Sequence, residues 1–138
     1  MEKLGSSGFR DVDHTADLAL EVWAPDLSAL FVQAALGMYH LMNIQLSKQP
    51  GFLHQFNLSA EDEESLLVKF LSEILFAVES KGIAFDSFSI KFAGLSLQLT
   101  AAAKHILNQT RTIKAVTFHN LSIRHEPGRY TVTIVFDV

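Results

Sequence analysis

The chain has 138 residues, of which 49% are hydrophobic and 19% charged, values typical of one folded domain. It contains no cysteine, which excludes disulfides, thiolate metal ligands and a cysteine nucleophile. The net charge is −4 and the 11 basic residues are scattered, so direct sequence-specific binding of nucleic acid is not expected.

The same sequence gives expectations for location and domain organisation. No stretch approaches the about 18 uninterrupted apolar residues of a membrane helix, and the first residues lack the apolar section of a signal peptide. We therefore expect a cytoplasmic protein without a membrane anchor. Residues 1–8 are expected to form a flexible N-terminal lead and residues 9–138 a single domain, and nothing demands more than a monomer.

The first strong pattern is a strand followed by a helix. Apolar residues alternate over 18–23, which predicts a strand. Pro25-Asp26 ends this strand and supplies Asp26 as the N-cap of a helix over 27–42. In that helix apolar residues recur every three or four positions, the pattern of a buried stripe.

A second strand and helix follow. The alternation of residues 52–58 predicts a strand, and the apolar stripe of about 64–80 predicts a helix that ends at Gly82. Four acidic residues, 61–64, precede it. A cluster of acids can resemble a metal site, but its spacing has no ligand geometry, and we interpret it as an acidic first turn that complements the helix dipole.

The rest of the chain predicts strands. Residues 88–92 and 95–99 alternate around Ala93-Gly94, which indicates a hairpin, whereas 101–108 is ambiguous between a strand end and a helical turn. Residues 114–123 are rich in strand-forming side chains, and 130–138 alternate clearly after the turn at Glu126-Pro127-Gly128. The sum is an α+β fold in which two helices pack on a mixed, mostly antiparallel β-sheet.

Familiar catalytic motifs are absent from the sequence: it has no glycine-rich nucleotide loop, no GxSxG elbow and no HExxH pair. One unusual segment is Asp11–Asp17, which carries three carboxylates and a histidine. Asp13, His14 and Asp17 could bind a cation there or position a hydrogen bond. They could equally make turn and capping hydrogen bonds in a solvated loop.

The chain end is the second unusual place. Asp137 is the penultimate residue of an apolar strand, and Val138 carries the terminal carboxylate. Two anionic groups at a strand end would repel each other if buried, and a hard cation such as Ca²⁺ would remove that repulsion. The alternative is an exposed, frayed terminus.

Several segments together resemble the archease family. Asp13-His14-Thr15-Ala16-Asp17, followed by an alternating strand and a helix of the pattern LxxLFxxAAxGMxxLM, is similar to the opening of archease proteins. SLLVKFLSEILF resembles the family's second helix, and the segment from Lys114 to Leu121 resembles its KAxTYHxL motif. Val135-Phe136-Asp137-Val138 resembles its terminus. The matches occur in the family's order over almost the whole chain.

This resemblance implies a function. Archeases are non-catalytic protein cofactors of RtcB-type RNA ligases, which join RNA ends in tRNA splicing and RNA repair. The ligase carries GMP on an active-site histidine, and the archease promotes this guanylylation and so supports multiple turnover. An RtcB-type ligase is therefore the expected partner.

The resemblance also implies a divalent metal ion, usually calcium, held by residues at both ends of the chain. Carried over by motif, the ligands are Asp17, Asp137 and Val138. A further set is expected to support these ligands or to contact the partner: Asp13, His14, Lys114, Thr117 and His119. Strand alternation would place Thr117 and His119 on one side and Lys114 on the other.

The chain departs from the family pattern at the start of the first helix. Many archeases are acidic there, with a segment of the type DTLEEAF, whereas this chain has PDLSALF over 25–31, so any partner contact made by those acids is altered. Two other functions remain open. One is a metal-dependent phosphoester hydrolase that uses Asp13, His14, Asp17, His119 and Asp137, and the other is a chaperone-like protein-binding module.

Overall fold

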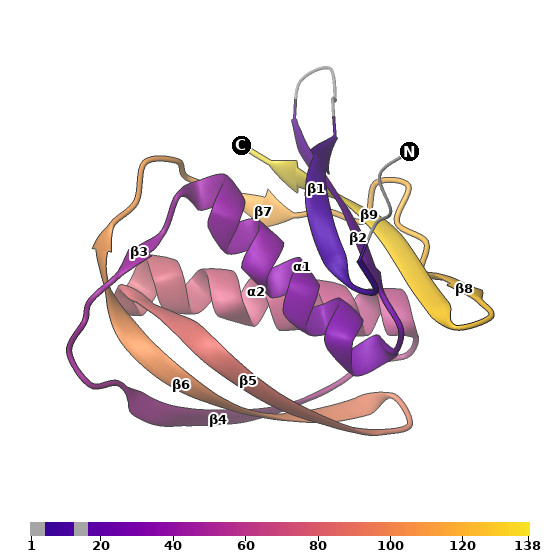
Figure 1. Cartoon of the computed structure of the whole chain (residues 1–138), viewed down its shortest axis with the longest axis horizontal. Coiled ribbons are helices and arrows are strands. Elements are labelled where there is room, and N and C mark those ends of the chain that lie inside the picture. The colour runs from indigo at the N-terminus through magenta and orange to yellow at the C-terminus, as the bar shows by residue number, and fades with distance from the viewer. Residues whose placement is uncertain (1–4, 13–16) are drawn as a thin grey trace.

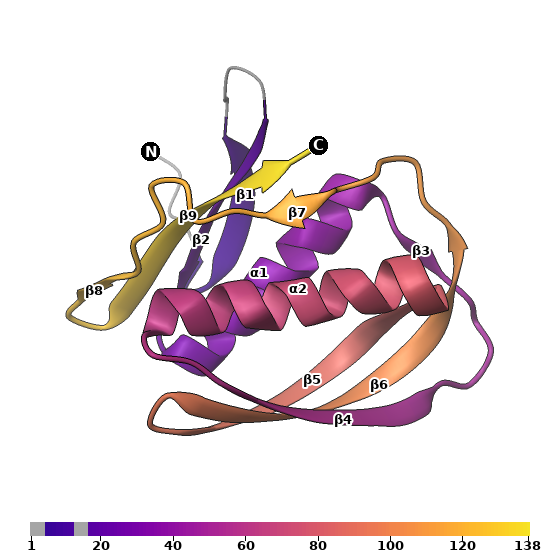
Figure 2. The same ribbon diagram turned by 180° about the vertical axis from the view of Figure 1, so that it is seen from behind.

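Two α-helices lie between two antiparallel β-sheets in the computed structural model, which describes residues 5–12 and 17–138 (Figure 1). Helix α1 spans Leu27–Met42 and helix α2 spans Glu63–Lys81. Seen from behind, α2 runs along the opening between the two sheets (Figure 2). The predicted α+β class is confirmed, and the structure adds that the strands form two sheets.

The first sheet carries both ends of the domain. Its order is β1-β2-β9-β7, with β8 also paired to β9, and each pairing among the described residues is antiparallel. Its strands are β1 (Gly8–Val12), β2 (Leu18–Ala24), β7 (Ala115–Val116), β8 (Arg124–Glu126) and β9 (Arg129–Asp137). Strand β9 therefore lies between β2 on one side and the short strands β7 and β8 on the other.

The second sheet is built around one long strand. β6 (Ser96–Asn108) pairs with β5 (Ile83–Ala93) along one edge, and with β4 (Phe52–Ser59) and β3 (Gln45–Leu46) along the other. Gly94 adopts a left-handed φ of 61° in the β5–β6 hairpin, a conformation that glycine reaches without a steric penalty.

The core follows from the alternation of the strands and the stripes of the helices. In the first sheet Leu20 and Val22 of β2, and Ile134 and Phe136 of β9, face the helices and are buried. The helices meet through their own buried aromatic side chains, such as Phe31 and Phe70, whose ring centroids lie 5.3 Å apart. One apolar core thus joins both sheets.

Side chains and backbone fix the helix ends. The N-cap Asp26 and the end of α2 at Gly82 are as the sequence predicts, whereas only Glu63 and Glu64 of the expected acidic first turn lie in that turn and Asp62 is the N-cap. Asp26 and Asp62 are the N-caps, and each accepts a hydrogen bond from the backbone N–H three residues later, at 2.8 Å and 2.7 Å. The hydrogen bonds from Ser65 hold the pKa of the Asp62 carboxyl below its usual value. At its C-terminus α2 ends at Gly82, which has a left-handed φ of 64°.

Two predicted regions turn out differently. The ambiguous segment 101–108 continues β6, but the strand predicted over 114–123 is wrong beyond Ala115–Val116. The chain turns away at Asn120, whose φ is 51°, and the backbone N–H of Ile123 donates to Glu64 on α2 at 2.9 Å. The short strands β1, β3 and β8 have no clear sequence pattern of their own. Within the described ranges, no helix has the length and apolar character needed to cross a membrane.

Candidate functional site

The pairing of β2 with β9 brings the two unusual segments of the sequence together. Leu18 lies opposite Phe136 in an antiparallel register, so one further step places Asp17 across from Asp137. Leu18 and Phe136 pack against the core, and alternation therefore puts both aspartates on the outer face of the sheet. Asp17 is half-buried and Asp137 is exposed. Both views show the C-terminus beside the β1 and β2 ends (Figures 1 and 2).

Strand β7 completes the surroundings of the chain end from the other side. Ala115 pairs with Asp137, and the backbone N–H of Lys114 donates to the Asp137 carbonyl at 2.8 Å. Continuing this register places Lys114 across from Val138. The Lys114 side chain is exposed, and Val138 is 40% exposed. The last two residues of the chain are therefore held between two strands, with a cationic residue beside them.

Thr117 and His119 sit where the chain leaves the sheet. The Thr117 hydroxyl donates to the Val135 carbonyl at 2.9 Å and accepts from the His119 backbone N–H at 3.2 Å. Thr117 thus ties the chain after β7 to Val135, two residues before Asp137. His119 belongs to the turn that follows. The predicted strand alternation does not extend to His119, because β7 ends at Val116.

The structure therefore places the sequence-predicted residues in three groups. Asp17, Asp137, Val138 and Lys114 meet at one end of the first sheet, and Thr117 lies next to them. His119 occupies the adjoining turn. Asp13 and His14 lie outside the described residues.

The chemistry of these donors fits a hard cation. Two aspartate side chains and a terminal carboxylate offer only anionic oxygen, which Ca²⁺ accepts and which zinc sites seldom use alone. Within the described part of the chain, no three His, Cys, Asp or Glu side chains form a group that could hold a metal. Asp17 and Asp137 are only two such side chains, so the expected ligand set reaches three with the Val138 carboxylate.

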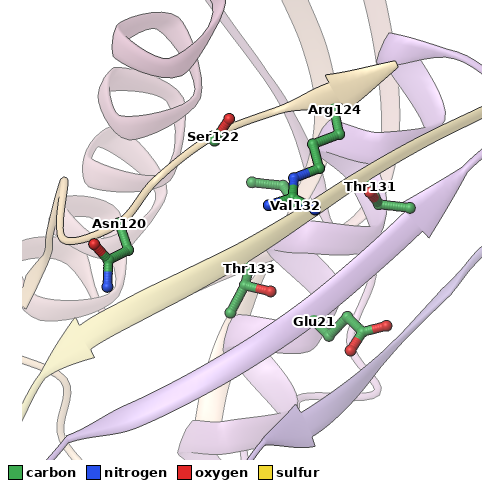
Figure 3. Close-up of a pocket in the computed structure, with 7 residues that line it drawn as sticks. All are labelled: Glu21, Asn120, Ser122, Arg124, Thr131, Val132 and Thr133. Atoms are coloured by element: carbon green, nitrogen blue, oxygen red, sulfur yellow. The ribbon is translucent and has the colours of Figure 1, made fainter. Parts of the chain in front are cut away.

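A separate polar hollow of about 310 Å³ lies on the first sheet (Figure 3). It is lined by Glu21, Asn120, Ser122, Arg124, Thr131, Val132 and Thr133. Glu21 forms a salt bridge with Arg10 at 2.9 Å. None of the sequence-predicted residues lines this hollow. Its members come from β2, β8, β9 and a loop, so no local motif could have indicated it.

A comparison with protein families decides the relationship. The model described as "Archease protein family (MTH1598/TM1083)" matches residues 9–138, the whole of the domain. The chain belongs to the archease family. It is 31% identical over 138 residues to the protein archease of Methanothermobacter thermautotrophicus, with 95% of this chain and 99% of that protein covered. The protein archease of Methanopyrus kandleri is 29% identical, with 94% and 99% covered.

Two solved structures share the archease fold with this chain. The solution structure of Methanobacterium thermoautotrophicum protein 1598 superposes with a TM-score of 0.73 at 29% identity, covering 95% of this chain and 99% of that one. The crystal structure of a Thermotoga maritima protein described as "an archease, possible chaperone" gives a TM-score of 0.71 at 24% identity. That match covers 94% of this chain and 96% of the other.

Proposed function

We propose that this archease is a non-catalytic, metal-binding activator of an RtcB-type RNA ligase in the cytoplasm. In this role it promotes guanylylation of the ligase and its repeated turnover in tRNA splicing and RNA repair. The observation that supports the proposal is the register of β2 and β9: Leu18 pairs with Phe136, so Asp17 and Asp137 lie next to this last pair at the same end of the sheet. These residues belong to two of the segments that resemble the family.

Charge supports action on a protein rather than on RNA directly. The chain has 15 acidic and 11 basic residues, so its formal charge of −4 disfavours unassisted phosphate-backbone binding. Although the chain as a whole is acidic, Lys114 places an exposed cation beside Asp137. We assign it the role of drawing an anionic group of the partner complex toward the chain end.

The metal part of the proposal assigns Asp17, Asp137 and the Val138 carboxylate as calcium ligands. A bound cation would supply positive charge that offsets the mutual repulsion of these anions and leaves open positions for an oxygen of the partner. Asp137→Asn keeps the shape of the side chain but removes its charge, so we expect calcium affinity to fall at least about tenfold. Calorimetric titration of wild type and variant with CaCl₂ measures this.

Glu126→Gln is the matched control for the calcium titration. Glu126 is an exposed carboxylate in the same sheet, paired with Arg129 at the opposite end of β9. Its loss should leave calcium binding unchanged. Equal calcium binding by wild type and Asp137→Asn would remove Asp137 from the ligand set.

Multiple-turnover RNA joining by the RtcB-type ligase of the same organism tests the function itself. The ligase is assayed alone and with wild type, Asp137→Asn or Glu126→Gln at a tenth of its concentration. We expect wild type and Glu126→Gln to raise turnover equally and Asp137→Asn to raise it little. If wild-type protein leaves turnover unchanged, the proposed function is wrong.

A chaperone-like role is the second candidate, and exposed apolar side chains favour it. Leu53 is 74% exposed, Leu107 70% and Phe118 58%, and a structural neighbour is described as a possible chaperone. This function predicts that the protein suppresses aggregation of unrelated unfolded clients, whereas a specific activator leaves their aggregation unchanged. Light scattering of a heated client protein separates the two.

A further inference from the structure

A groove of about 690 Å³ runs along the open side of α2, away from the chain terminus. Its apolar wall is formed by Leu58 and Ala60 at the end of β4, Val68 on α2, and Phe118 in the loop after β7. The size is within the range of pockets that take ligand side chains. In Figure 2, α2 lies between β4 and β7 on the side facing the viewer.

Phe118 is an exposed residue in a loop that hydrogen bonds hold in place. Its side chain is 58% exposed, although the loop that carries it is tied down on both sides. Thr117 bonds to Val135, the Leu121 N–H donates to the Phe118 carbonyl at 3.1 Å, and the Ile123 N–H donates to Glu64. These bonds hold the backbone around Phe118, so its aromatic side chain is presented at the groove, and aromatic residues are enriched among binding anchors at protein interfaces.

The charges around the groove indicate which kind of ligand it would bind. Glu61 and Glu73 are both exposed and line the groove: Glu61 lies just before α2 and its acidic first turn, and Glu73 lies in the middle of the helix. Lys69 is the cation among the described lining residues, and its Nζ already donates to the Ser59 carbonyl at 2.7 Å. The groove therefore combines an apolar wall with two carboxylates against one ammonium, a net negative charge that complements an apolar side chain flanked by Lys or Arg.

One short segment of the chain links the groove to the chain-terminal site. Residues 114–118 form one short segment: Lys114 is bonded to the Asp137 backbone at one end, and Phe118 lines the groove at the other. A partner seated over the end of β9 would therefore lie within reach of the groove.

We propose that the α2 groove docks a basic amphipathic segment of the partner ligase, with an apolar side chain between Val68 and Phe118 and cationic residues facing Glu61 and Glu73. This inference rests on the proposed function, since it assigns the ligase as the partner. It separates two tasks: the groove holds the partner, and the end of β9 acts on it.

The test measures binding of the purified RtcB-type ligase to immobilised archease in calcium-containing buffer at two salt concentrations. Phe118→Ser removes the aromatic anchor, and Glu73→Lys reverses one charge. We expect the first to weaken binding at least about tenfold, and the second to weaken it about fivefold and to reduce its salt dependence. Both positions are exposed, so circular dichroism should show an unchanged fold.

Two control variants match these changes elsewhere on the surface. Phe52→Ser alters an aromatic side chain that is 46% exposed on the second sheet, and Glu126→Lys reverses a charge in the β8–β9 hairpin. Both should bind the ligase like wild type. Equal losses from Phe118→Ser and Phe52→Ser would indicate non-specific adhesion and overturn the proposal.

The outcomes also separate the groove from the proposed function. If Phe118→Ser and Glu73→Lys bind like wild type while Asp137→Asn fails to stimulate RNA joining, the groove proposal is overturned and the activator function stands. If the wild-type protein neither binds nor stimulates the ligase, the activator function fails, and the groove fails with it as a ligase dock.

Discussion

At the scale of single residues, Tyr39 shows how a polar group is accommodated inside the core. Its side chain is 8% exposed, and its hydroxyl oxygen accepts a hydrogen bond from the backbone N–H of Phe85 at 3.0 Å. Phe85 lies where the register of β5 against β6 shifts by a bulge. The hydroxyl therefore serves a buried backbone donor next to an irregularity of the sheet.

Replacing Tyr39 with phenylalanine should destabilise the protein by about 1–3 kcal/mol, because the Phe85 N–H would lose its acceptor in a buried place. Urea unfolding of wild type and variant measures the change in the free energy of unfolding. Tyr130→Phe is the control, since Tyr130 is half-buried and stacks on His125 at 4.1 Å. An equally stable Tyr39→Phe variant would contradict the assigned hydrogen bond.

Tyr39 should also make the stability of the folded protein depend on pH in the alkaline range. Burial raises the pKa of Tyr39 well above its ordinary value of 10.0. Above about pH 10 the unfolded chain therefore loses this proton while the folded protein keeps it. Stability should fall in this window by up to about 1.4 kcal/mol per pH unit. The difference between wild type and Tyr39→Phe isolates this contribution, and parallel pH profiles would contradict it.

At the scale of elements, helix α1, which local sequence signals define, was predicted correctly, whereas a strand that depends on long-range pairing was not. Helix α1 begins and ends as predicted, because its N-cap Asp26 and its apolar stripe lie within one short stretch of sequence. The strand predicted over 114–123 failed beyond Val116 although its partner β9 continues back to Arg129, because composition indicates a strand but not where a segment leaves its partner. A hydrogen bond from Ile123 to Glu64 draws that segment toward α2, and no pattern within the segment reveals it.

Gly37 shows how closely an element approaches its neighbours. It lies in the middle of α1, and a Cβ added there would collide with the buried Leu20 side chain and come within 3.0 Å of Phe9 Cγ. Alanine favours a helix by about 1 kcal/mol over glycine, but overpacking costs about 1–3 kcal/mol. We expect Gly37→Ala to lower the free energy of unfolding by about 1 kcal/mol.

A double-mutant cycle identifies the cause of that loss. In a Leu20→Ala background the colliding side chain is shortened, so Gly37→Ala should be neutral or stabilising there. Chemical denaturation of the four proteins gives the coupling. A stabilising effect of Gly37→Ala in the wild-type background would mean that α1 does not pack tightly on β2.

At the scale of the whole molecule, the candidate site depends on pairings between distant parts of the chain. The sequence offered Asp17 and Asp137 as separate oddities, and the family resemblance linked them. Physical reasoning from the residues alone could not link these two aspartates, because the register of β2 against β9 is a long-range property. The α2 groove is beyond local patterns for the same reason, since Leu58, Val68 and Phe118 meet only after folding.

One short segment of the chain links the two candidate surfaces. Both sheets cover the helices, and the chain terminus and Phe118 are joined by the short segment from Lys114. A partner could therefore contact an anionic strand end and an apolar groove without any rearrangement of the core. The proposed activator role requires only such surface contacts.

The measurement that tests this account most directly is guanylylation of the ligase after each round of RNA joining. Ligase in excess over archease is supplied with labelled GTP and RNA, and the protein-bound label is followed over time. The account predicts that wild type and Glu126→Gln restore the labelled ligase after each round, whereas Asp137→Asn does not. Equal labelling with and without the wild-type protein would contradict it.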